Sequence, residues 1–137
     1  MPGLFDPHVH IGVSDTFGDD AIATDFQYDT RDCLIGGVTT IATTTLIGRE
    51  SLPKLSRAIK CGEARSWRDF KITSVVNTLG QVKQIPVVAK AGGVSYKFFA
   101  GYVGEQAEAF GMSRDRISPG LFYEACRQIS SSVTSRK

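Results

Sequence analysis

The two histidines of this 137-residue chain stand close together near its start, in the stretch Asp6-Pro7-His8-Val9-His10. Side chains two residues apart on a β-strand point to the same face, so Asp6, His8 and His10 are expected to project together. Two imidazoles at one strand end can bind a transition-metal ion such as zinc. The alternative is an ordinary pair of polar residues beside a loop, because short His-x-His matches also occur by chance. The sequence has no third histidine, so a metal here needs oxygen ligands or another chain.

Lys97 is the second residue with unusual surroundings, because it lies within the apolar stretch Val94-Ser95-Tyr96-Lys97-Phe98-Phe99. Burial disfavours an ammonium and lowers the pKa of a lysine, which makes a neutral, nucleophilic amine accessible. Such an amine reacts with carbon dioxide to form a carbamate, whose two oxygens can bridge two metal ions. The alternative is a lysine whose stem is buried while its head reaches water.

Tyr102 follows five residues after Lys97, just beyond the predicted end of that strand. Active-site residues of barrel enzymes gather at such strand ends. A phenol there can donate a hydrogen bond to an oxyanion. Tyrosine is also common at loop edges, so position alone leaves its role open.

Strand-like and helix-like stretches alternate along the chain, and these elements must position the side chains above. Strands are expected at residues 3–10, 38–45, 70–78 and 94–100, and helices at 26–35, 51–67, 80–91 and 119–129. The stretches 11–24 and 101–118 are expected to be loops, Pro86 is expected to weaken its helix, and a polar tail is expected to fray from about residue 130. Trp67, Phe70 and Phe122 are expected in the core.

This alternation predicts parallel strands joined by right-handed crossovers. About four βα units are half the number in a closed eight-stranded barrel. We therefore predict an α/β fold with a single domain over residues 1–137, a partial (half) TIM-type barrel, with a small open sheet as the alternative.

Composition and charge exclude several classes of function. The formal charge of +2 is small and no basic run concentrates it, so nucleic acid is not an expected partner. The apolar runs are too short to cross a bilayer and no signal peptide is visible, so no membrane partner is expected. The three cysteines are far apart and odd in number, which is typical of a reduced, cytoplasmic setting.

At these residues the sequence resembles the amidohydrolase superfamily, in its dihydropyrimidinase and hydantoinase branch. Three stretches carry the resemblance, and they follow one another in the order that the family shows. They are residues 2–10 around His8 and His10, the Gly-Gly-Val-Thr-Thr-Ile stretch at 36–41, and residues 93–102 with Lys97 and Tyr102. Many amidohydrolases share the first, whereas its combination with Lys97 and Tyr102 is much more specific.

The resemblance implies a metal-dependent hydrolase that opens a small cyclic amide or imide ring. In the complete family site two divalent metals, usually zinc, are bound. His8 and His10 would bind one, carbamylated Lys97 would bridge to the second, and Tyr102 would steady the oxyanion. Dihydroorotases commonly have an arginine two residues after the second histidine. This chain has Gly12 there, which favours a hydantoin or dihydropyrimidine over the carboxylate-bearing dihydroorotate.

The chain also departs from the family pattern. Family members continue for four more βα units that supply two histidines and an aspartate, so we expect at most one metal here and a fragment of a hydrolase that is inactive alone. A half barrel exposes two sheet edges, which predicts a homo-oligomer or a complementary half-barrel chain. The alternative is a non-catalytic structural or interaction protein from the same family.

Overall fold

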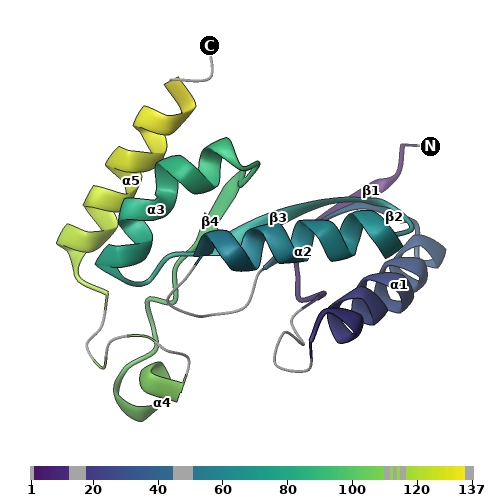
Figure 1. The fold of residues 1–137 in the computed structure, drawn as a ribbon, viewed down its shortest axis with the longest axis horizontal. Coiled ribbons are helices and arrows are strands. Elements are labelled where there is room, and N and C mark those ends of the chain that lie inside the picture. Colours follow the sequence, from purple (N-terminus) through teal and green to yellow (C-terminus); the bar gives the residue numbers. More distant parts are fainter. Residues whose placement is uncertain are drawn as a thin grey trace.

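Four parallel strands form one sheet in the order β1-β2-β3-β4, as the sequence predicts. They are β1 (Leu4–Val9), β2 (Val38–Thr44), β3 (Asp69–Val75) and β4 (Ser95–Lys97). The sheet curls into a partial α/β barrel, with a helix after each strand (Figure 1). The computed structural model describes residues 2–12, 18–44, 51–109, 112, 114 and 117–134.

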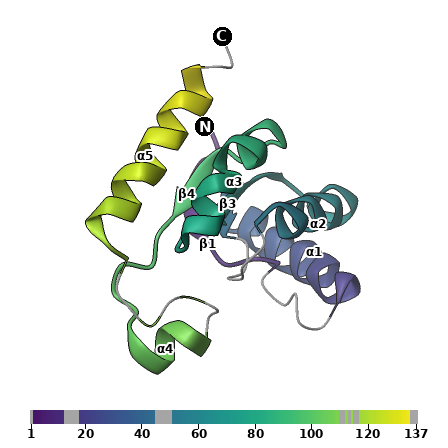
Figure 2. The ribbon, with the colours of Figure 1, turned by 60° about the vertical axis from the view of Figure 1, so that its left-hand side comes forward.

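The helices follow one another around one face of the sheet (Figure 2). They are α1 (Asp19–Ile35), α2 (Ser51–Arg65), α3 (Leu79–Lys90), the short α4 (Gly104–Ala109) and α5 (Pro119–Thr134). α1 contacts α2, α2 contacts α3, and α3 contacts α5. Each crossover therefore returns the chain to the next parallel strand, as in a barrel.

The core lies between the sheet and these helices, in two clusters. The first joins the side chains of α1, α2, β2, β3 and α3, among them Phe26, Ile41, Leu55, Ile72 and Val88. The second joins Val76, Val82, Ile85 and Ala125, which holds α5 against α3. Burial of apolar surface contributes roughly 25 cal/mol per Å², so these clusters hold the helix layer on the sheet.

α1 begins seven residues earlier than predicted, at Asp19 instead of Phe26. The acidic stretch was interpreted as loop, but Asp19 and Asp20 form the first turn, where the helix dipole favours negative charge. Asp19 also pairs with Arg57 of α2, and Ile22 is buried. The long loop predicted for 11–24 was therefore wrong in its second half.

The predicted loop 101–118 contains α4, which the sequence did not indicate. α3 runs from Leu79 to Lys90 with Pro86 inside it, so the proline does not split the helix. The fourth strand is only three residues long, because the Asn77 side chain, instead of the ladder, accepts the Phe99 amide (2.8 Å).

α5 continues to Thr134, so the polar tail predicted from about residue 130 is helical at its start. The hydroxyls of Ser131 and Ser132 donate to the carbonyls of Arg127 and Gln128, four residues earlier. These polar side chains are therefore bonded to the helix backbone.

Two of the three aromatic residues expected in the core are largely outside it. Phe70 packs against the core and contacts Phe26, with ring centroids 5.1 Å apart. Trp67 is 60% exposed and Phe122 is 49% exposed. Phe122 contacts Phe98 at the edge of the second cluster, with ring centroids 5.1 Å apart.

Candidate metal centre

His8 and His10 lie at the carboxyl end of β1, where the strand is irregular. Between Asp6 and Val9, β1 uses one residue more than the facing segment of β2, from Ile41 to Thr43. Such a bulge breaks the alternation of side chains. The predicted grouping of Asp6 with the two histidines is therefore not found: its Oδ1 accepts the backbone N–H of His8 (3.0 Å) instead.

The residue after His10 is fixed to the neighbouring strand by one hydroxyl. Oγ1 of Thr43 accepts the Ile11 backbone N–H (2.8 Å) and donates to the Ile11 carbonyl (2.7 Å). A hydroxyl has one proton and two lone pairs, so it can make both bonds at once. These two hydrogen bonds to Thr43 fix the chain directly after His10, although β1 has already ended.

Gly12 then turns the chain away with a positive φ of 72°. A Cβ at this position would lie 2.6 Å from Cε2 of Phe26 and 3.3 Å from Cγ2 of Ile22. Both are core side chains that cannot withdraw freely. Glycine is therefore required here both by the backbone conformation and by the packing.

Lys97, the last residue of β4, reaches across to both histidines. Its Nζ lies 2.8 Å from Nε2 of His8 and 3.4 Å from Nε2 of His10, and the two Nε2 atoms are 3.2 Å apart. We call these three side chains the nitrogen cluster. The sequence predicted that all three residues lie at one end of the sheet, and the structure brings them into contact. Lys97 is half-buried, less enclosed than its apolar stretch suggested.

Hydrogen bonds within the nitrogen cluster can run in either direction, because the donor and acceptor roles of the imidazole nitrogens depend on the tautomer. Burial of the imidazole lowers the pKa of His10, and the charges of Lys97 and His8 lower it further. The lowered pKa favours the neutral imidazole of His10, which is the form that can bind a metal ion.

This donor set fits a metal ion that binds nitrogen. Two ligand nitrogens at about 2.0–2.1 Å from a tetrahedral zinc lie about 3.3 Å apart. The two Nε2 atoms, 3.2 Å apart, match that separation. Across the described ranges no group of three or more His, Cys, Asp and Glu side chains could hold a metal, so the cluster offers two imidazoles and one amine.

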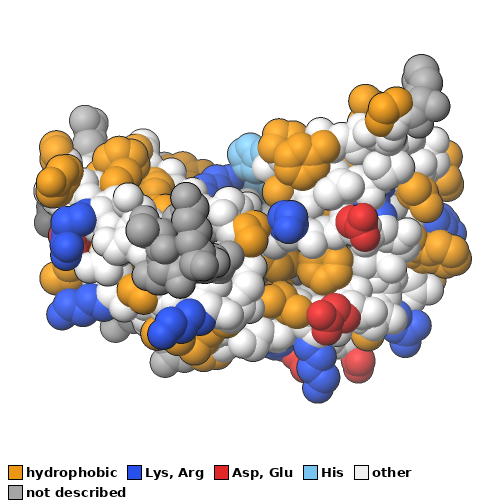
Figure 3. Space-filling view, turned by 90° about the horizontal axis from the view of Figure 1, so that it is seen from above, with side chains coloured by type: hydrophobic (Ala, Val, Ile, Leu, Met, Phe, Trp, Pro, Cys, Tyr) orange, Lys and Arg blue, Asp and Glu red, His pale blue; other side chains and the backbone are white. Residues whose placement is uncertain are grey.

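A cavity of about 240 Å³ opens beside the nitrogen cluster. It is lined by Pro7, His8, Thr44, Thr73, Tyr96 and Lys97. Figure 3 shows the histidines beside a basic side chain, between the two larger masses of the molecule. Thr44 and Thr73 face each other in the strand register, and the hydroxyl of Thr73 bonds that of Ser95 (2.6 Å). The sequence analysis did not identify these hydroxyls. The signal that could have found them is a Thr or Ser at matching positions of three neighbouring strands.

Tyr102 connects to the nitrogen cluster through Phe99. The rings of Phe99 and Tyr102 stack with centroids 5.2 Å apart and an interplanar angle of 11°. Lys97 places its Nζ 4.9 Å from the centroid of the same Phe99 ring. The structure thus positions Tyr102 beyond Phe99 and outside the three-nitrogen contact, and sequence reasoning did not identify Phe99.

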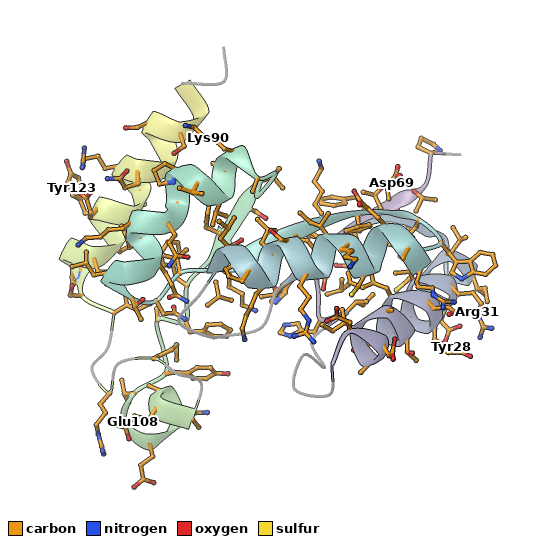
Figure 4. All side chains as sticks on the ribbon, in the orientation of Figure 1. Tyr28, Arg31, Asp69, Lys90, Glu108 and Tyr123 are labelled. Carbon is orange, nitrogen blue, oxygen red and sulfur yellow. The ribbon has the colours of Figure 1, made fainter. Side chains whose placement is uncertain are left out.

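A second cavity, of about 500 Å³, lies at the opposite end of the strands. Its lining includes Thr40, Glu63, Asp69, Lys71 and the buried Arg68. Figure 4 labels Asp69 there, at the start of β3. Nε of Arg68 donates to the Thr30 carbonyl (3.0 Å). Within the described part of the chain, its two terminal nitrogens are buried and have no partner.

None of the described helices is long and apolar enough to span a bilayer.

Comparison with solved structures finds a hydantoinase. L-hydantoinase (dihydropyrimidinase) from Arthrobacter aurescens superposes with a TM-score of 0.73 and 24% sequence identity. The match covers 96% of this chain and 28% of that chain, so the present chain spans about a quarter of that protein. No protein-family model and no curated protein sequence matches. At this identity the likeness shows a shared fold, that of a part of the hydantoinase chain.

Proposed function

We propose that this chain supplies one half of the active site of a metal-dependent hydrolase that opens cyclic amides. The single observation that carries the proposal is the convergence of three nitrogens from β1 and β4, within 2.8–3.4 Å of one another, beside a cavity. Carboxyl ends of barrel strands are where enzymes of this architecture place their chemistry. The likeness to a hydantoinase supports the reaction class.

His8 and His10 would hold one divalent metal ion, most simply zinc, through their Nε2 atoms. A metal ion bound there lowers the pKa of water and polarises a carbonyl oxygen. The structure supports this role because the two Nε2 atoms lie 3.2 Å apart, with Nζ of Lys97 close to both. Tetrahedral zinc sites need further ligands beyond these two imidazoles.

Lys97 would act as a carbamate. A neutral amine attacks carbon dioxide, the C–N bond forms as one C=O π-electron pair moves to oxygen, and the nitrogen releases one proton to solvent, so that an anionic carbamate replaces the neutral amine. That anion adds oxygen ligands to a site that otherwise has only imidazoles. Phe99 lies against the Lys97 side chain and limits where its tip can move.

Tyr102 would donate its phenolic proton to the oxyanion that develops when water adds to the ring carbonyl. Its stacking on Phe99 orients the phenol ring. For the substrate we propose a hydantoin or dihydropyrimidine ring. Gly12 supports this choice, because an arginine there would clash with Phe26 and adopt a strained φ.

The test is the zinc content of the purified chain after loading with zinc and bicarbonate. We expect up to about one zinc per chain, lost in His10→Ala and reduced in Lys97→Ala. Lys90→Ala is the matched control, because Lys90 is exposed in the last turn of α3 (Figure 4).

Absence of zinc from the wild-type chain at saturating metal would refute the metal site and favour the non-catalytic interaction protein. Hydrolysis of hydantoin or dihydrouracil by the isolated monomer would contradict the half-site proposal, because one half should be inactive alone.

A further inference from the structure

Three hydroxyl side chains stand at matching positions of β2, β3 and β4, and the proposed function gives them no role. Thr44 is the register partner of Thr73, and Thr73 is the register partner of Ser95. We call Thr44, Thr73 and Ser95 the hydroxyl row. Side chains two residues apart on a strand share a face, so Ser95 projects to the same side of the sheet as Lys97. The hydroxyl row therefore lies on the face that carries the nitrogen cluster.

The hydroxyl row borders the cavity beside the nitrogen cluster. Thr44 and Thr73 line this cavity together with His8 and Lys97. Thr44 is buried, and Thr73 is half-buried. Hydrogen bonds are stronger in such surroundings than in bulk water. Because Ser95 precedes Lys97 on β4, a ligand in the cavity has the hydroxyls on its amino side and the nitrogen cluster on its carboxyl side.

The hydroxyls of Thr73 and Ser95 form a bond whose direction can reverse. Their two oxygens lie 2.6 Å apart, and either side chain can be the donor. A hydroxyl has one proton to donate and two lone pairs that accept. Thr73 can therefore present a proton or a lone pair to a ligand, according to the direction of its bond to Ser95. The hydroxyl row matches N–H and C=O groups alike.

The rest of the lining favours a small, neutral, polar ring. Among the described residues that line the cavity there is no carboxylate. The Tyr96 hydroxyl donates to the Ile85 carbonyl (3.3 Å), so the neutral polar groups that line the cavity are the threonine hydroxyls. Pockets for drug-sized ligands measure about 300–1,000 Å³. A cavity of about 240 Å³ therefore suits a ligand with a single small ring.

We propose that Thr44 and Thr73, with Ser95 behind Thr73, recognise the N–H and C=O groups of the ring whose amide is opened at the nitrogen cluster. This inference rests on the proposed hydrolase and specifies which part of the substrate the chain selects. Neighbouring strands lie about 4.8 Å apart, so hydroxyls on β2 and β3 can contact two adjacent polar groups of one ring.

The hydroxyl row selects rings by what an unsuitable ring leaves unpaired. Hydantoin and dihydrouracil present N–H and C=O groups in alternation around the ring. A ring without N–H groups leaves a hydroxyl lone pair in the cavity without a donor, and an enclosed polar group without a partner is unfavourable. Sites built to hydrogen-bond a substrate therefore reject analogues that lack the matching group.

The experiment measures the binding of hydantoin and of 1,3-dimethylhydantoin to the zinc-loaded chain, by NMR titration of the backbone amide signals. The dimethyl compound keeps the ring and both carbonyls but has no N–H group. We expect the wild-type chain to bind hydantoin at least about tenfold more tightly. Thr73→Val and Thr44→Val should each lower this ratio by about threefold or more, because each removes one hydroxyl. Thr73→Ser, which keeps the hydroxyl, should retain the ratio.

Thr40→Val is the matched control. Thr40 lies four residues before Thr44 on β2, and therefore on the same face of the strand, but it lines the cavity at the opposite end of the sheet. The same change of side chain at this position should leave the ratio of the two affinities unchanged.

Equal affinity of the wild-type chain for the two rings, or no binding of hydantoin at millimolar concentration, would overturn the inference, whichever variants fold. Equal ratios in Thr73→Val, Thr44→Val and Thr40→Val would also overturn it. Zinc content of the same samples separates this inference from the proposed hydrolase. A chain that binds zinc but does not distinguish the rings keeps the metal site and loses the recognition role of the hydroxyls. A chain that distinguishes the rings through Thr73 without taking up zinc retains that role and refutes the hydrolase.

Discussion

The two ends of the sheet differ in what their charged side chains do. At the carboxyl ends of the strands, two imidazoles and one amine point at one another beside a cavity of about 240 Å³. At the amino ends, a cavity about twice as large, 500 Å³, adjoins the buried Arg68, whose Nε bonds a helix carbonyl. The larger cavity is thus next to a cation held by the fold, and the smaller one next to groups with available lone pairs. Volume is a poorer guide to chemistry than the convergence of donors.

This difference agrees with the general division of labour in barrels, in which one rim carries chemistry and the other stability. Arg68 lies near the last turns of α1 and α2, where carbonyl groups carry partial negative charge. The Nε of its guanidinium is held by the Thr30 carbonyl, while its two terminal nitrogens have no partner among the described residues. The nitrogen cluster instead brings three basic groups within 2.8–3.4 Å of one another, an arrangement that a shared cation would stabilise.

The largest expected effect tests whether the carboxyl rim depends on the packing behind it. Gly12→Ala should lower the free energy of unfolding by about 1–3 kcal/mol, because it combines a strained φ with a Cβ placed 2.6 Å from Phe26. It should also weaken zinc binding, since the strain acts two residues from His10. Urea unfolding and zinc titration measure both.

Gly101→Ala is the control for that substitution, because a Cβ there meets nothing within 4 Å. An unchanged stability of Gly12→Ala would mean that the site does not rely on this turn.

A smaller effect is expected at the amino rim. Arg68→Met should change the free energy of unfolding by less than about 1 kcal/mol, because it removes two buried, unpartnered nitrogens along with one hydrogen bond. Zinc binding should be unchanged. Arg65→Met, at an exposed arginine on α2, is the comparison. Loss of zinc in Arg68→Met would break the division between the two rims.

The smallest effect concerns pH. The pKa of His10 is lowered from its ordinary 6.5 in the folded chain, so the unfolded chain takes up this proton first as the pH falls. The corresponding stability is complete above pH 6.5 and is lost as the pH falls through the lower folded-state value. Urea midpoints of the zinc-free chain between about pH 7.5 and about pH 5 should show this decrease. The same pH series on His10→Gln should lack the decrease in stability that comes from protonation of His10.

The sequence predicted the βα order and the rim that holds His8, His10 and Lys97, because hydrophobic periodicity and glycine positions are local signals. The bulge in β1 was not predictable, since it depends on the pairing register with β2. For this reason Asp6 was wrongly grouped with the histidines. The long loop was misassigned because acidic residues fit both a loop and a helix start.

Tyr102 illustrates the other limit. Its place in the sequence gives its distance along the chain from Lys97 but not the ring that stands between them. The stacking with Phe99 is a packing result of the residues after β4. The exposure of Trp67 and Phe122 could not be predicted from the sequence either, because burial depends on which helices have a neighbour.

The hydroxyl of Thr43 has a consequence for how such a protein can diversify. By bonding both the amide and the carbonyl of Ile11, it anchors the chain at the point where His10 ends and the connection to α1 begins. Sequence changes on the α1 side of this anchor would then act away from His10. Selection could accumulate such changes over many generations while the two imidazoles keep their positions.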